Sequence, residues 1–263
     1  MILKLLPRQS LLFVSLDHSQ FGPFCIAVMA VSFRKGRALP IWCQVNRSQA
    51  GLMKPLLRGL KKLASELSRD QKLVLVMDRL FCGIKLFELI TAHGRYFICR
   101  AKYDRRVVVP WENKSIPVGE ISHTELTIEY YRLSLRMVRS NLELGMKESE
   151  PWFLLTNLPS ELASRTRIIH RYAERFEIEE SFKDMKWFQK LEWQQIKKTS
   201  VIRILLFFIF IGWWFIWTLT LRHKELRTRA PNPKHCPSWF KSAWEAIYRL
   251  SWPDELRFTL LSP

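Results

Sequence analysis

The first hundred residues alternate between short apolar runs and polar breaks. Three such runs come first: Leu11 to Leu16, Phe24 to Phe33, and a third within Arg37 to Val45. Each is short and rich in β-branched or aromatic residues, as strands are. Because the links between them are also short, we expect three antiparallel strands at the start of the chain.

Helical and strand patterns alternate after this meander. Leucines recur at helical spacing from Gly51 to Leu67, with lysines and arginines on the other face, which predicts an amphipathic helix. The continuous apolar run from Lys72 to Met77 is typical of a strand buried in the centre of a sheet. A second helix is expected from about Cys82 to Ala92 and a fifth strand from Arg95 to Ala101. The predicted order is βββαβαβ.

The second half of the chain changes character. Polar alternation and turn residues from about 103 to 157 predict a β insertion, and a helical pattern returns from Ser164 to Trp187. A proline-rich stretch precedes a last short helical piece. We therefore divide the chain into a first part of a core domain (1–102), a β-rich insertion (103–160), a second part of the core with an apolar helix (161–228) and a tail (229–263).

One stretch has the composition of a membrane span. Residues from Ile204 to Leu221 carry no charge, and 18 such residues are just enough to cross a bilayer. Both flanks are basic, so they favour neither orientation. A helix that is apolar all round can also be buried inside a domain. We interpret the stretch as a core helix and expect no membrane association, with a membrane-anchored basic protein as the alternative.

Charge indicates the class of partner. Lysine and arginine outnumber the acids 42 to 24, for a net charge of +18, and 48% apolar residues are ample for a core. Such an excess favours a polyanion, with nucleic acid ahead of an anionic membrane. Five scattered cysteines without paired spacing indicate reduced thiols, and the short apolar run before Pro7 is unlike a secretory signal. These features favour a cytoplasmic protein.

Two aspartates follow apolar strands. Asp17 comes after the run ending at Leu16, and Asp78 after the run ending at Met77. Strand ends hold active-site groups rigidly, although either residue alone could simply end its strand as a turn or cap. With Glu179 they would offer hard oxygen ligands to Mg²⁺ or Mn²⁺. Two such ions, about 3.5 to 4 Å apart, can activate water for attack on a phosphodiester.

The segment Arg171 to Trp187, "RYAERFEIEESFKDMKW", mixes acids, bases and aromatics. At about 100° per residue, Tyr172, Arg175, Glu179 and Lys186 fall within one face of a helix. The ordinary interpretation is a solvated helix with ion pairs, such as Glu179 with Lys183. The alternative is an acid surrounded by groups that bind phosphates.

This spacing, Y-(2)-R-(3)-E-(6)-K, resembles the signature of the DDE transposases of bacterial insertion sequences, in the family-four (YREK) group. The resemblance extends from about Leu11 to Leu221. It implies an α/β fold that is RNase H-like and similar to retroviral integrases: a mixed five-stranded sheet flanked by helices, with a mostly β insertion before the glutamate helix.

The resemblance also implies a site and a reaction. Asp17, Asp78 and Glu179 would be the catalytic and metal-binding acids, with two Mg²⁺ or Mn²⁺ ions. Tyr172, Arg175 and Lys186 would contact DNA near the transposon end, and Arg79 fits a phosphate contact. The partners implied are double-stranded DNA, at the transposon ends and the target, and a second copy of the chain. The location implied is the bacterial cytoplasm, at the nucleoid.

The sequence departs from the family in two places. The family commonly has Arg and then Gly after the second aspartate, whereas here Leu80 follows Arg79. The first strand begins about ten residues from Met1, where relatives carry an end-binding region, so we expect a shortened protein that could be inactive. Trp111 could stack on a flipped base, but we favour ordinary packing. The rival functions are an RNase H-like nuclease without strand transfer and an inactive DNA-binding remnant.

Overall fold

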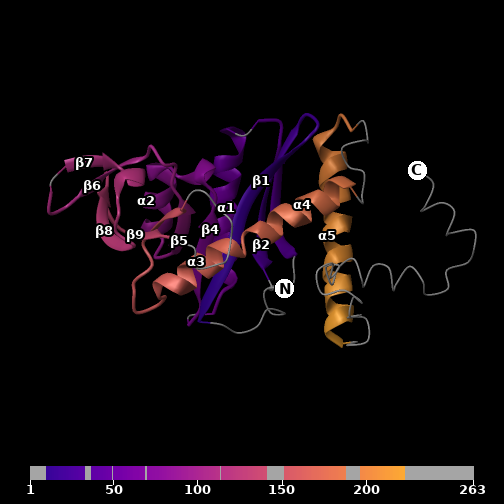
Figure 1. Ribbon diagram of the computed structural model, residues 1–263. Helices are drawn as coiled ribbons and strands as arrows, with labels where there is room; N and C mark the ends of the chain where they lie inside the picture. The colour runs from indigo at the N-terminus through magenta and orange to yellow at the C-terminus, as the bar shows by residue number, and fades with distance from the viewer. Residues whose placement is uncertain are drawn as a thin grey trace, which may run out of the picture.

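The computed structural model describes residues 10–32, 37–48, 50–68, 70–112, 114–140, 151–187 and 196–222. Within this part of the chain, ten strands form one sheet in the order β3-β2-β1-β4-β5-β10-β9-β8-β6-β7 (Figure 1). The strands are β1 (Leu11–Phe21), β2 (Phe24–Ser32), β3 (Ala38–Asn46), β4 (Lys72–Met77), β5 (Tyr96–Arg100), β6 (Arg106–Val109), β7 (Lys114–Pro117), β8 (Glu125–Tyr130), β9 (Leu133–Arg139) and β10 (Phe153–Thr156).

The first five strands form the mixed sheet that the sequence predicts. β1 pairs antiparallel with β2 and parallel with β4, and β4 pairs parallel with β5. Both β1 and β4 have a neighbouring strand on each side. Because helices also cover both faces of the sheet here, most residues of these two strands are buried. The predicted α/β class, with a mixed sheet flanked by helices, is confirmed.

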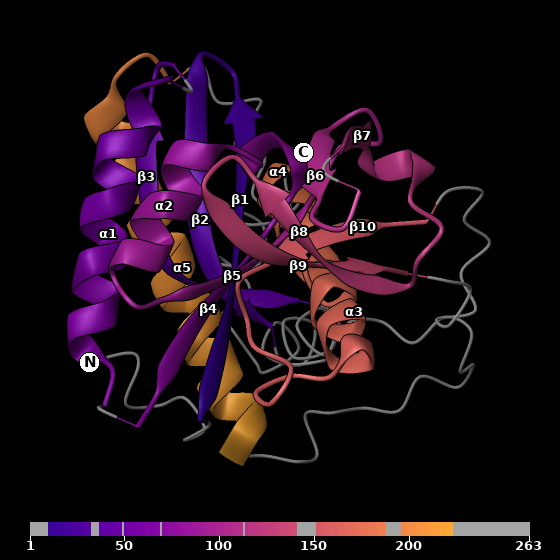
Figure 2. The ribbon, with the colours of Figure 1, turned by 90° about the vertical axis from the view of Figure 1, so that its left-hand side faces the viewer.

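Helices cover both faces of this sheet. The α-helices are α1 (Met53–Glu66), α2 (Ile84–Ala92), α3 (Arg165–Ala173), α4 (Phe176–Trp187) and α5 (Thr199–Arg222). Figure 2 shows α1 and α2 in front of the sheet, with α5 behind it. Alternate residues of β1 serve the two layers: Leu12 and Leu16 join the cluster that contains α1 and α2, whereas Leu11 and Phe13 pack with α3.

The β insertion extends the same sheet instead of forming a separate one. β10 pairs antiparallel with β5 on one side and with β9 on the other, so the strands of the insertion continue outward from the core. The sheet is therefore larger than the five strands we expected. The boundaries between our four segments stay a prediction, and the proline-rich tail from 229 lies outside the described residues.

The first strand is longer than its apolar run. We expected it to end at Leu16, but β1 continues to Phe21 because its antiparallel pairing with β2 extends to Phe21 opposite Phe24. The turn between them is only two residues long, and Gly22 lies there at φ +54°, a conformation that favours glycine. Asp17 is therefore inside a strand, held on one side by β2.

The predicted helix from Ser164 to Trp187 is interrupted. α3 ends at Ala173 and α4 begins at Phe176, with Glu174 and Arg175 in a turn between them. Hydrogen bonds of the tighter i to i−3 type bridge this turn, from Arg175 N–H to the Tyr172 carbonyl and from Ile178 N–H to the Arg175 carbonyl. The two helices keep a common direction across the sheet in Figure 1.

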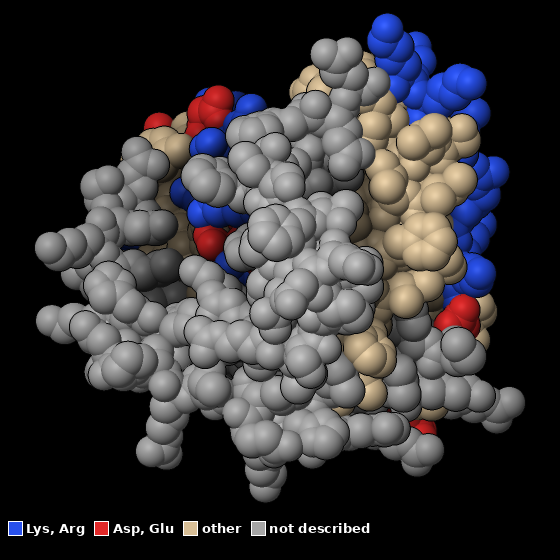
Figure 3. Space-filling view, turned by 90° about the vertical axis from the view of Figure 1, so that its right-hand side faces the viewer, with Lys and Arg blue, Asp and Glu red and all other residues tan. Residues whose placement is uncertain are grey.

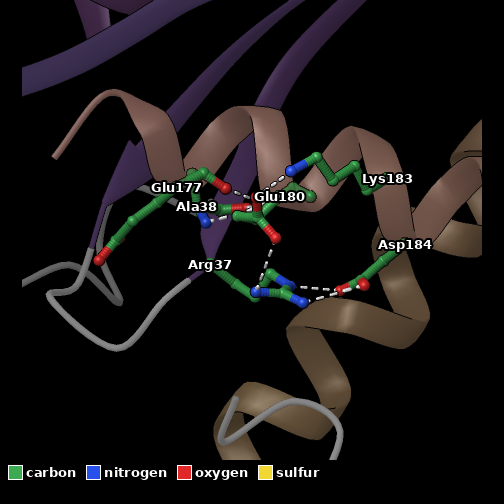
Figure 4. A network of polar contacts seen from close by, with 7 residues as sticks. Arg37, Ala38, Glu177, Glu180, Lys183 and Asp184 are labelled. Carbon is green, nitrogen blue, oxygen red and sulfur yellow. Dashed lines mark hydrogen bonds and ion pairs between the residues drawn. The ribbon is translucent and has the colours of Figure 1, made fainter. Parts of the chain in front are cut away.

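A polar network anchors α4 to the edge strand β3 (Figure 4). Arg37, just before β3, pairs with Asp184 of α4 and lies 3.9 Å from Glu180. The buried Ser181 hydroxyl accepts a hydrogen bond from Ala38 N–H at 3.0 Å and lies 2.9 Å from the Glu177 carbonyl oxygen. These contacts fix the rotation of α4 and hence the direction of its other side chains.

α5 is the helix that the uncharged stretch predicts. It lies against β3, where Trp214 donates a hydrogen bond from Nε1 to the Pro40 carbonyl oxygen at 2.7 Å. Residues Thr199–Thr218 are long and apolar enough to cross a membrane, yet a third of the most apolar window is buried in the protein. Its other side is open, with Phe207, Phe208 and Phe215 at least 60% exposed. A broad uncharged surface, edged by lysines and arginines, is visible on this side in Figure 3.

Candidate active site

The sheet register brings the two aspartates together. The parallel pairing of β1 with β4 ends at Leu16 opposite Met77; Asp17 is the next residue of β1, and Asp78 directly follows β4. In β4, Val74 and Val76 face the α3 layer, and Phe13 of β1 does the same. Alternation along each strand therefore directs Asp17 and Asp78 to the α3 side of the sheet. There they lie on adjacent strands at the same level.

Neither aspartate acts as a cap in this structure. Asp78 precedes the 3₁₀ turn η3 (Arg79–Phe81), but its side chain makes no capping hydrogen bond there. The turn forms without glycine, closed by a bond from Phe81 N–H to the Asp78 carbonyl at 2.9 Å. Asp17 uses one carboxylate oxygen to accept the N–H of His18 at 2.7 Å. Other oxygens of both carboxylates are directed to the helices above.

Arg175 joins two of the three acids. Its Nη1 donates to Asp17 Oδ2 at 2.8 Å, and its Nη2 donates to Glu179 Oε1 at 2.6 Å. The Tyr172 hydroxyl lies 3.4 Å from Asp78 Oδ1, and the guanidinium lies over the Tyr172 ring at 5.6 Å. The turn between α3 and α4 thus lets one tyrosine and one arginine reach all three predicted catalytic acids.

Burial sets the electrostatics of the cluster. Desolvation, together with the smaller effects of the charges of Glu179 and Asp78, raises the pKa of Asp17 to about 6, against the opposing effect of Arg175. Burial also raises the pKa of Tyr172, which stays a neutral phenol. Desolvation acts against the charge of Arg175, but Tyr172 and the acids outweigh it, so its pKa is raised. The site is a group of three carboxylates around one buried cation, and only Asp17 among the three is buried.

The structure assigns the signature residues different environments. We expected Tyr172 and Arg175 to contact DNA. In this conformation Tyr172 is fully buried and Arg175 is 3% exposed, and both contact the acids instead. Glu179 has 41% of its side chain exposed. Lys183 pairs with Glu180, not with Glu179 as the ordinary interpretation of the helix had it. The ammonium of Lys186 lies over the Phe21 ring at 5.3 Å, at the end of β1.

A basic groove adjoins the acids, and the sequence did not reveal it. It has a volume of about 490 Å³ and is lined by residues that include Arg79, Arg100, Lys102 and Tyr103. Because Met77 pairs with Cys99, Arg100 is next to Asp78 in register. The signal was present in the bases at the end of β5 and shortly after it, Arg100 and Lys102, but its meaning depended on which strand lies beside β4.

Trp111 is not packed as we expected. It is 61% exposed, and its ring meets that of His123 in a T-shaped contact, with 5.9 Å between the centroids.

The acids suit a divalent ion by their chemistry. Three carboxylates around one guanidinium leave an excess of negative charge, and Mg²⁺ and Mn²⁺ prefer such oxygen ligands. Within the described residues, however, no three His, Cys, Asp or Glu side chains are gathered closely enough to hold an ion as they stand. In this structure Arg175 supplies the positive charge between Asp17 and Glu179.

Comparison with known proteins gives the family. Residues 25–215 match the family described as "Transposase DDE domain". The chain belongs to this family. The matched region of the DDE domain includes Asp78 and the whole segment from Tyr172 to Lys186, whereas Asp17 lies before it. Asp17 is therefore placed in the site by the structure, through the strand register and its ion pair with Arg175. No curated protein is similar enough in sequence to count as a match.

The fold of this DDE domain is similar to that of a solved transposase. The structure is described as "Cryo-EM structure of piggyBac transposase synaptic complex with hairpin DNA", with a TM-score of 0.50 and 13% sequence identity. The similarity covers 95% of this chain and 54% of that chain, so the chain spans about half the length of the solved protein. At this identity the likeness concerns the fold.

Proposed function

We propose that the protein is a DNA transposase of the DDE type, which cuts and joins DNA phosphodiesters at the ends of an insertion sequence. The observation that carries the proposal is the convergence of Asp17, Asp78 and Glu179 on Tyr172 and Arg175, within a chain that belongs to the DDE family. The net charge of +18 supports a DNA partner.

The acids would hold divalent metal ions, Mg²⁺ or Mn²⁺, in the proposed reaction. Bound in pairs, such ions activate a water or a 3′-hydroxyl and stabilise the leaving oxygen. Asp17 and Asp78, fixed by the central strands, would form the rigid side of the site. Glu179, which is more exposed on its helix, would complete it. The reaction needs no covalent link between protein and DNA.

The bases around the acids would have two roles. Arg175 and Tyr172 are buried, so both position the carboxylates, and Arg175 also balances part of their negative charge. Arg79 is exposed directly after Asp78, and Lys186 lies near the turn at the end of β1, so both are candidates for phosphate contacts. Four exposed bases of α1, on the opposite face of the sheet, offer a further track for the DNA backbone: Lys54, Arg58, Lys61 and Lys62.

The finer assignment rests on the signature alone. We propose that the protein belongs to the family-four (YREK) group, because Tyr172, Arg175, Glu179 and Lys186 keep its spacing. We also propose that it acts as a homodimer, since joining two ends in one complex requires two active sites, and that it works in the cytoplasm, where the nucleoid lies.

A cleavage and joining assay tests the proposal. The purified protein is incubated with DNA carrying the ends of its own element, in Mg²⁺ or Mn²⁺, and the products are separated on a denaturing gel. We expect nicking at the ends and transfer of precleaved ends to a target, both abolished by a chelator. Glu179→Gln should lose at least 100-fold in activity while DNA affinity stays within about twofold.

Glu180→Gln provides the matched control. Glu180 is the next carboxylate on the same helix and faces Arg37 and Lys183, away from the aspartates. We expect this variant to keep its activity. Cleavage without joining of precleaved ends would identify a nuclease, and DNA binding without cleavage would identify an inactive remnant; either result would contradict the proposal.

A further inference from the structure

The groove beside the acids combines positive charge with an exposed aromatic ring. Arg79 and Lys102 are exposed, Arg100 is partly exposed, and Asp104 is the one acid among the described residues that line the groove. Within the described part of the chain, the three basic side chains make no hydrogen bond or ion pair. Like charges placed together with so few acids repel one another in the free protein. A bound polyanion would relieve this repulsion, which favours its binding in the groove.

Tyr103 is exposed and yet fixed in position. Its side chain belongs to a residue that is 58% exposed, but one part of the ring lies against the backbone of Gly119. A Cβ atom at position 119 would come within 2.3 Å of the ring, so only glycine permits this approach. The Gly119 N–H donates to the Tyr103 carbonyl at 3.0 Å, and the ring meets Phe153 edge to face at 5.9 Å.

A fixed exposed ring among free bases is suited to a single DNA strand. Aromatic side chains stack on unpaired bases without regard to sequence, while basic side chains follow the phosphates. A paired base inside a duplex offers no free face for such stacking. The groove also begins at the acids, because Arg79 follows Asp78 in sequence and Arg100 is next to Asp78 in register.

We propose that this groove binds the unpaired DNA strand next to the phosphodiester that is cut, with Tyr103 stacked on a base and Arg100 and Lys102 on phosphates. The inference rests on the proposed function and names the path of one strand within it. The proposal assigns a role in DNA binding to the first part of the insertion, because Tyr103 and the Gly119 that supports it both lie there.

Binding to two DNA probes tests the groove. One probe is a blunt duplex, and the other is the same duplex with a four-nucleotide unpaired extension that carries 2-aminopurine. We expect Tyr103→Ala to lose about 5- to 30-fold in affinity for the extended probe and little for the blunt one. Tyr103→Phe should keep both the affinity and the quenching of 2-aminopurine.

A charge-matched pair of double variants supplies the control. Arg100→Gln with Lys102→Gln should lower the slope of log affinity against log salt by about 1.4 to 1.8 on the extended probe, as expected for two lost phosphate contacts. Lys54→Gln with Arg58→Gln removes the same charge from α1. Because these two bases belong to the proposed backbone track on α1, we expect this control to lower the affinity for both probes alike and to leave the ratio of the two affinities unchanged.

The outcomes separate this inference from the proposed function. If the wild-type protein cuts and joins ends while Tyr103→Ala binds both probes like the wild type, the groove assignment is wrong and the transposase remains. If Tyr103→Ala abolishes the preference for the extension in a protein that cuts nothing, the groove stands and the transposase does not. Should the tyrosine variant unfold, the double variant of Arg100 and Lys102 decides the groove assignment, since both side chains reach solvent: an unchanged salt slope would overturn it.

Discussion

At the scale of single residues, the acids depend on their position in the sheet. Asp17 is a strand residue with a side chain only 12% exposed, and Arg175 is 3% exposed. Such a pair loses much solvation on folding, so the geometry of its hydrogen bonds decides whether it stabilises the fold. The pKa of Asp17, raised to about 6, indicates that burial outweighs the attraction of Arg175.

This burial predicts how stability depends on pH in metal-free buffer. The folded protein binds a proton at Asp17 up to about pH 6, whereas the unfolded chain releases it near 3.8. The free energy of unfolding should therefore fall as pH rises from about 4 to 6, by roughly 3 kcal/mol from this group. In Asp17→Asn the free energy of unfolding should depend less on pH between about 4 and 6. Urea unfolding at a series of pH values, with a chelator present, measures this dependence.

An exposed carboxylate gives the comparison for this measurement. Asp104→Asn removes a negative charge near the same edge of the sheet without touching a buried pair. Its curve should run parallel to that of the wild type. A curve for Asp17→Asn that is also parallel to the wild type would show that burial of Asp17 does not control the pH dependence.

At the scale of elements, the position of Glu179 depends on how α4 is held. The helix meets the sheet edge through Ser181, whose hydroxyl satisfies Ala38 N–H, and through the pair of Arg37 with Asp184. We expect Ser181→Ala to lower the free energy of unfolding by roughly 1–3 kcal/mol, because a buried strand N–H loses its partner. Urea unfolding measures the difference.

Ser65→Ala is the matched control for this loss. Ser65 lies on α1 and donates to the Lys62 carbonyl at 2.8 Å, but it is exposed, so water replaces the lost bond. We expect a change below about 0.5 kcal/mol. If Ser181→Ala and Ser65→Ala lowered the free energy of unfolding equally, the hydrogen bond between α4 and β3 would contribute no more to stability than an exposed one.

The sequence predicted the elements better than their junctions. Apolar runs located β1, β4 and β5, and the two aspartates that follow such runs lie side by side in the sheet. The extension of β1 to Phe21 was not predicted, because it depends on pairing with β2 and not on apolar content. The turn at Glu174 and Arg175 was missed as well. Helical spacing continues across it, and the tertiary contacts of Arg175 determine where the helix breaks.

The groove shows a second limit of the sequence. Its bases at Arg100 and Lys102 are separated from Asp78 by more than twenty residues, and only the parallel pairing of β4 with β5 brings Arg100 beside it. Similarly, Gly119 supports Tyr103 across a hairpin. Pairings between distant strands are set by the whole sheet, so local patterns could not predict these neighbours.

At the scale of the whole molecule, charge and apolar surface lie on different sides. The acids and the groove lie at the ends of the central strands, and the bases of α1 cover one face of the sheet. The open side of α5 is apolar instead, with Ile204, Phe208 and Ile211 all exposed. This side has the composition expected of a membrane contact, but the opposite side of the same helix is part of the core.

The two sides of α5 predict opposite effects of a charge. If the helix remains on the sheet, Phe208→Arg places a charge in water, and the stability and yield of the protein should stay unchanged. In a bilayer the same change would cost about 2.5–3.5 kcal/mol at mid-helix. Trp214→Arg, on the buried side, should prevent folding, because Trp214 is 7% exposed and bonds to Pro40.

After extraction of cell membranes with alkaline carbonate, we expect both the wild type and Phe208→Arg in the supernatant. Recovery of the wild type in the pellet and of Phe208→Arg in the supernatant would mean that α5 binds lipid through its open side.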